Sequence, residues 1–142
     1  MAKKWLMTAV VFGLVVMIGG CGGKYSDVIE LNKRFVKLMN DFSDEVIEVN
    51  SADGAASALN GLADEMEKLA PEMREMSEKY PELNDPDNLP EPLQKSREES
   101  QAAGQRYAQS FMKLMPYMSG SGVQAAHARL ARVMSDMGPA QK

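Results

Sequence analysis

The chain has 142 residues, a net charge of −4 at pH 7 and a single cysteine, Cys21. One cysteine excludes disulfide bonds within the chain and metal sites built from several thiolates. The length suits one domain with a single core, and the acidic net charge argues against nucleic-acid binding, which needs a basic patch.

An uncharged, largely apolar segment, residues 5–20, follows Lys3 and Lys4 near the start of the chain. A membrane-spanning helix needs about 20 apolar residues, whereas the apolar part of an export signal needs about 7 to 15. The segment ends in two glycines, which favours a signal peptide over residues 1–20. A retained transmembrane anchor is the alternative. In both cases the rest of the chain faces away from the cytoplasm.

The segment runs into Ile18-Gly19-Gly20-Cys21. This sequence resembles the lipobox of bacterial lipoproteins, in which a branched apolar residue and two small residues precede a lipidated cysteine. The resemblance implies cleavage between Gly20 and Cys21, a diacylglycerol thioether on Cys21 and acylation of the new amino terminus, for example by palmitate. More than one acyl chain holds a protein durably on a bilayer. The resemblance thus implies a membrane anchor on the periplasmic face, and Gly22 after Cys21 favours the outer membrane.

Four stretches of the chain place apolar residues at alternating spacings of three and four, the period of an amphipathic helix. These stretches are residues 25–50, 54–80, 92–118 and 122–137. The spacing is most regular in the second stretch and continues in phase across Pro71, which predicts one kinked helix there. The sequence therefore predicts an all-α, antiparallel up-down helical bundle of three long helices plus a shorter fourth, over residues 25–138.

Shorter segments flank and connect these helices. Short turns at two of the three junctions predict that helices consecutive in the chain pack as antiparallel neighbours. Residues 81–92 contain four prolines and predict a long connector without helix, with either a structural or a functional role. Residues 21–24 are expected to form a lipidated tether, and residues 139–142 a frayed tail.

Charge is distributed unevenly along the chain. Residues 41–91 contain fifteen acidic and three basic residues, a balance of −12, whereas residues 92–142 contain three acidic and seven basic residues, a balance of +4. The acidic residues are interpreted as a solvated helix face. This interpretation also allows the acidic segment to pack beside the basic one.

Catalytic and metal-binding motifs are few. The only histidine, His127, lies between alanines and is expected to be an ordinary residue at a helix surface or at the boundary of the core. Di-iron bundles need Glu-x-x-His on two helices, and covalent haem attachment needs Cys-x-x-Cys-His; the chain contains neither motif. No catalytic residue is predicted.

The order of the helices resembles the plan of cytochrome b562, an exported four-helix bundle. That family binds haem through a methionine on its first helix and a histidine near the end of its last helix. In this chain Met39 lies midway along residues 25–50, and His127 lies near the start of residues 122–137. The ligand positions therefore depart from the family, and no cofactor is predicted.

Two other patterns allow more than one interpretation. Met112, Met115 and Met118 share one side of the third helix and are expected to pack in the core, although thioethers at this spacing suit an adaptable binding groove or Cu(I) as well. With His127 they are the weak candidates for a metal site, and no metal is predicted. Small residues from Ser100 to Gly104 suit close helix packing or leave room for a ligand.

These observations predict a lipid-anchored, non-enzymatic lipoprotein of the cell envelope that acts through contacts with an envelope protein, in a structural or interaction role. The alternative is a periplasmic carrier that binds a metal, haem or an apolar ligand inside the bundle. Acyl chains on Cys21 are expected to provide the membrane contact.

Overall fold

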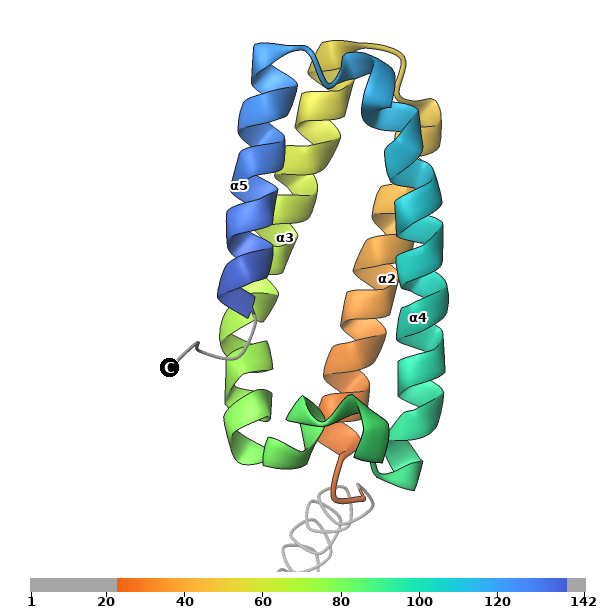
Figure 1. Cartoon of the computed structure of the whole chain (residues 1–142), viewed down its shortest axis with the longest axis vertical. Helices are drawn as coiled ribbons and strands as arrows, with labels where there is room; N and C mark the ends of the chain where they lie inside the picture. Colours follow the sequence, from red (N-terminus) through yellow and green to blue (C-terminus); the bar gives the residue numbers. More distant parts are fainter. Residues whose placement is uncertain (1–22, 138–142) are drawn as a thin grey trace, which may run out of the picture.

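The computed structural model describes residues 23–137, which form a bundle of four α-helices (Figure 1). The helices are α2 (Ser26–Glu48), α3 (Ala52–Lys79), α4 (Glu91–Phe111) and α5 (Ser121–Met137). This range contains no strand, and the predicted all-α class with three longer helices and a shorter fourth is confirmed. The predicted signal peptide, Cys21, Gly22 and the predicted tail lie outside the described residues.

The helices form two parallel pairs. α5 lies along α3, and α4 lies along α2, while α2 and α3 join the pairs as antiparallel neighbours. Consecutive helices run in opposite directions, which confirms the predicted up-down bundle. The prediction that they pack as neighbours is right for α2 and α3 but wrong for α4 and α5. A 3₁₀ helix, η3 (Met112–Tyr117), separates α4 from α5. At about 2 Å per residue it spans about 12 Å, which brings the start of α5 to the start of α3, where a Cβ built on Gly120 lies 3.5 Å from the Cβ of Ala52.

Pro116 explains why α4 ends before the predicted residue 118. Proline has no N–H to donate to the carbonyl four residues earlier, and its ring crowds that carbonyl. The α-helix ends at Phe111, and the chain continues as the 3₁₀ helix η3, whose hydrogen bonds span three residues. Pro71 does not interrupt α3, which is one continuous helix as predicted.

The main core lies between the two pairs, toward the end of the bundle where α3 and α5 begin. Its largest fully buried apolar side chains are Leu59, Met66, Leu114, Leu130, Val46 and Val123. Ser43 is fully buried among them, and its hydroxyl donates a hydrogen bond to the carbonyl of Met39 at 2.8 Å. None of the described helices combines the length and apolar character needed to cross a membrane.

A second, smaller core closes the opposite end, which is called the tether end here because the described chain begins there at Gly23. Tyr25, Tyr80 and Leu93 are buried in it, and the two tyrosine rings lie 5.2 Å apart. The connector covers this end with two 3₁₀ turns, η1 (Pro81–Asn84) and η2 (Pro86–Asn88). The expectation of a connector without helix is therefore wrong. Each turn begins at a proline, whose fixed φ suits a first helical position.

Ion pairs join the acidic and basic halves of the chain. The guanidinium of Arg129 on α5 lies 2.7 Å from Asp64 and 2.9 Å from Glu67, both on α3. On the other pair of helices, Arg106 of α4 forms an ion pair with Asp44 of α2. The structure thus confirms that the acidic segment packs beside the basic one. Because these side chains are partly exposed, each pair contributes little to stability.

Candidate functional site

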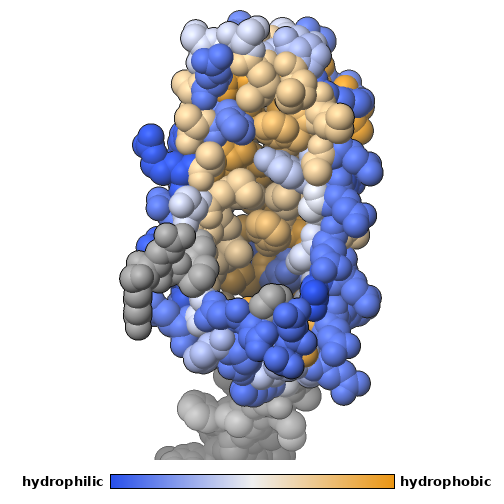
Figure 2. All heavy atoms as spheres, in the orientation of Figure 1, coloured by the Kyte–Doolittle hydropathy of each residue, from blue (hydrophilic) through white to orange (hydrophobic). Residues whose placement is uncertain are grey.

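A groove opens on one face of the bundle, between the two helix pairs, where α5 ends before the neighbouring helices do. α5 has 17 residues and α3 has 28, so at 1.5 Å per residue α5 is about 16 Å shorter. Both helices begin at the same end. Among residues 23–137, α5 therefore does not extend along the part of α3 nearest the tether end. Figure 2 shows the result as tan and orange side chains gathered in a hollow between hydrophilic margins.

The hollow next to the end of α5 has a volume of about 320 Å³. It is called the apolar groove below. Four elements contribute its apolar lining, which consists of Val28, Leu31 and Phe35 of α2, Met73 and Met76 of α3, Leu83 of η1 and Met137 of α5. Its polar lining consists of Asn32, Ser77, Asn84 and Ser100. None of the described residues that line the groove is charged, so it suits an uncharged, apolar surface or molecule.

The polar groups on the groove wall are already paired with one another. The Ser100 hydroxyl donates to the side-chain oxygen of Asn32 at 2.5 Å, and the Asn32 amide donates to the carbonyl of Ser96 at 3.0 Å. On the opposite wall the Ser77 hydroxyl donates to Asn84 at 2.9 Å. These bonds hold α2 to α4 and η1 to α3, and they fix the shape of the groove.

Of the small residues from Ser100 to Gly104, Ser100 lines the groove and Ala103 is buried. Ala102 is exposed, and a Cβ built on Gly104 meets no atom within 4 Å. Close helix packing therefore accounts for Ala103 but not for Ala102 or Gly104.

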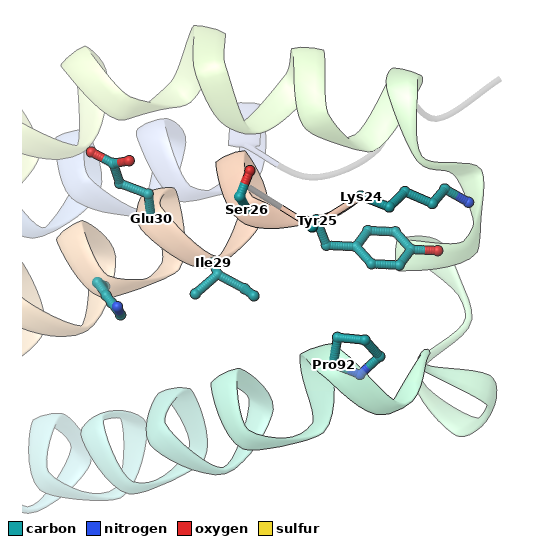
Figure 3. Close-up of a pocket in the computed structure, with 8 residues that line it drawn as sticks. Lys24, Tyr25, Ser26, Ile29, Glu30 and Pro92 are labelled. Atoms are coloured by element: carbon teal, nitrogen blue, oxygen red, sulfur yellow. The ribbon is translucent and has the colours of Figure 1, made fainter. Parts of the chain in front are cut away.

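A second hollow, of about 600 Å³, lies beside the first described residues. Tyr25 and Ile29 line it from the α2 side, and Pro92 lines it from α4 (Figure 3). Gly23 and Lys24 also border it. The described part of the chain therefore begins at this hollow.

A network of hydrogen bonds and ion pairs fastens the first described residues to the connector. The Tyr25 hydroxyl donates to Glu82 at 2.6 Å, and the Lys24 ammonium lies 3.1 Å from the same oxygen. These contacts, the Tyr25 hydrogen bond first among them, lower the pKa of Glu82 from its ordinary value of 4.5 to about 2. Beside them, the Lys79 ammonium lies 2.6 Å from Asp27 and lowers the pKa of that carboxyl.

Replacement of Glu82 by glutamine is expected to weaken the dependence of stability on acid pH. A carboxyl whose pKa is lower in the folded state contributes stability above its unfolded pKa and loses it as the pH falls toward its folded pKa, here from about 5 to about 2. Urea unfolding of the wild type and E82Q across this range measures the effect. The difference in the free energy of unfolding between the two proteins should be large at the upper end of this pH range and shrink toward the lower end.

The matched control is E75Q, at an exposed glutamate of α3. If E82Q and E75Q showed the same pH profile, the proposed role of Glu82 would be wrong.

The predicted core position of the methionine triplet is wrong for two of its members. Met112 is 71% exposed and Met115 is 60% exposed, while Met118 is half-buried against the core. The cause is the change from α-helix to 3₁₀ helix, which alters the direction in which each side chain points. Leu114 is fully buried in their place.

His127 is half-buried on α5, and its ring lies 5.4 Å from the ring of Phe111 at a tilt of 48°. The buried polar side chains among residues 23–137 are Ser43, Ser96 and Ser110, so no described carboxylate is buried beside the imidazole. The same residues contain no cluster of three histidine, cysteine or acidic side chains able to hold a metal ion. His127 is therefore placed at the boundary of the core, where it packs against an aromatic ring.

Comparison with known proteins identifies no relative. No family model matches the chain, and no curated protein or solved structure is significantly similar to it.

The apolar groove was not predicted from the sequence, although a short fourth helix was. Most of its apolar lining lies in the stretches 25–50 and 54–80, and an apolar stripe alone does not identify the helix that covers it. The difference in length between the second and fourth stretches was the available signal, because a shorter neighbour leaves the last turns of a longer helix uncovered.

Proposed function

We propose that this chain is a lipid-anchored, non-enzymatic lipoprotein of the bacterial envelope that binds another protein through the apolar groove. The observation that supports it best is the groove itself, an apolar surface formed by four elements and not covered by any other helix of residues 23–137. Apolar surfaces of this kind, bordered by polar residues, are typical of interaction sites. The anchor rests on the lipobox-like sequence that ends at Cys21.

The position of the groove agrees with this proposal. Val28 and Leu83 place it near the tether end, and only Gly22 and Gly23 separate Cys21 from Lys24. An acylated Cys21 would therefore hold the groove close to the bilayer surface. The partner we propose is an envelope protein that presents an apolar segment near the membrane, such as one face of an amphipathic helix.

A carrier of a small apolar molecule is the second candidate, and the volume of the groove favours it. Sites for small molecules commonly have volumes of about 300 to 1,000 Å³ and mainly apolar walls, and this groove measures about 320 Å³. Paired polar groups at Asn32 and Ser100 lie on the wall, so the molecule would gain most of its affinity from apolar contacts.

Photocrosslinking in cells separates these two candidates. We expect a photoreactive phenylalanine derivative at Ser77, on the groove wall, to form a discrete adduct with an envelope protein. The same derivative at Ser57, an exposed position on the same helix, should not form it. A small adduct at Ser77 with the mass of a lipid or metabolite would favour the carrier. If both positions gave the same adducts, or Ser77 gave none, the groove would bind neither an envelope protein nor a small molecule.

A further inference from the structure

The methionines of η3 lie on one face of a short helix. A 3₁₀ helix has three residues per turn, so residues three apart in sequence lie directly above one another. Met112 and Met115 belong to η3, and Met118 continues its pattern, because the Met118 N–H donates to the Met115 carbonyl at 3.2 Å. At a rise of about 2 Å per residue, successive methionines are about 6 Å apart along the axis.

Two of these methionines, Met112 and Met115, lie away from the face that holds η3 to the bundle, whereas Met118 packs partly against the main core. Leu114 is fully buried, and Phe111 and Tyr117 pack against the core beside it. Met112 and Met115, by contrast, are 71% and 60% exposed. Packing in this chain therefore explains Leu114 but gives no reason for two methionines on the solvent side. The methionine face lies at the opposite end of the bundle from the tether (Figure 1).

We propose that Met112, Met115 and Met118 bind a soft monovalent metal ion, Cu(I). Thioether sulfur is a soft ligand that selects Cu(I), whereas hard and borderline cations prefer oxygen and nitrogen ligands. Methionine has three rotatable bonds, so neighbouring side chains can direct their sulfur atoms to one ion. The described residues offer no cluster of histidine or acidic side chains that would favour another metal.

This inference does not depend on the lipid anchor or on the apolar groove. Its main alternative is an apolar contact with a protein, since methionine also serves at adaptable binding surfaces. Replacement of the methionines by leucine separates the two hypotheses, because leucine keeps the apolar surface but removes the sulfur. It should abolish metal binding and preserve an apolar protein contact.

Silver(I) is the probe, because it mimics Cu(I) and needs no reductant. The full protein, purified from membranes, would be titrated with Ag(I) alone and examined by native mass spectrometry and by the NMR signals of the methionine methyl groups. We expect one bound ion and shifts of the methyl signals of Met112, Met115 and Met118.

Two variants make the test specific. Loss of a residue that only supports a metal ligand lowers the affinity for the metal about 10- to 100-fold. Loss of two ligands in M112L/M115L should therefore lower the affinity for Ag(I) by at least the same factor. The control is M134L, at a methionine of α5 that is 42% exposed, which should bind as the wild type does. Circular dichroism checks that both variants stay helical. Wild-type affinity in M112L/M115L, or shifts confined to other methionines, would overturn the proposal.

Discussion

Replacement of Leu59 by alanine is expected to lower the free energy of unfolding by about 2 to 5 kcal/mol. Leu59 is fully buried on α3, at the main core where α3 meets both α2 and α5. Removing its side chain loses apolar burial and leaves a cavity that the neighbouring helices fill only in part. Urea unfolding at neutral pH, followed by circular dichroism, measures this loss.

The matched control is Leu83→Ala, at a leucine that lines the apolar groove and is only half-buried. Because less of its surface leaves water on folding, its loss should cost about 1 kcal/mol or less. Equal losses for the two leucines would show that the groove is packed as tightly as the main core, and this would contradict the open groove on which the proposed function rests.

The sequence predicted the helices well because each of them has one dominant apolar face. The spacing over residues 54–80 stays in phase for seven turns, and α3 is continuous through Pro71. The helix begins at Ala52, directly after Ser51, and the Gly54 N–H donates to the Ser51 hydroxyl at 3.1 Å, so Ser51 is its N-cap. Local signals of this kind need no knowledge of distant contacts.

The sequence did not predict which helices become neighbours. An apolar stripe shows that a helix buries one face, but it does not identify the helix on the other side. Short turns suggested that α4 and α5 pack together, whereas η3 lies between them and α5 packs on α3. The groove depends on this arrangement, because it forms where α5 ends on α3 and α4 stays with α2.

The methionine triplet shows the same limit on a smaller scale. At α-helical geometry its spacing is compatible with a core face, and the predicted core position followed from that geometry. Pro116 changes the local helix type, and Met112 and Met115 point to solvent instead. From the sequence, Pro116 predicts a weaker last turn of the third helix. The directions in which the three methionine side chains point follow only from the 3₁₀ geometry.

The second large effect concerns Cys21. Replacement of Cys21 by serine is expected to abolish acylation completely, because serine has no thiol to form the thioether. A lipoprotein signal peptide is cut only after the cysteine has been lipidated, so the resemblance to the lipobox implies that C21S keeps residues 1–20. The matched control is S26A, at an exposed serine of the first turn of α2, which should be processed as the wild type is.

The most direct test of the central claim is the mass of the N-terminal peptide from protein purified from native membranes. The proposed function predicts a peptide that begins at Cys21 and carries the mass of a diacylglycerol group and an additional acyl chain. A peptide that begins at Met1, or an unmodified Cys21, would contradict the lipid anchor and with it the placement of the groove beside the membrane.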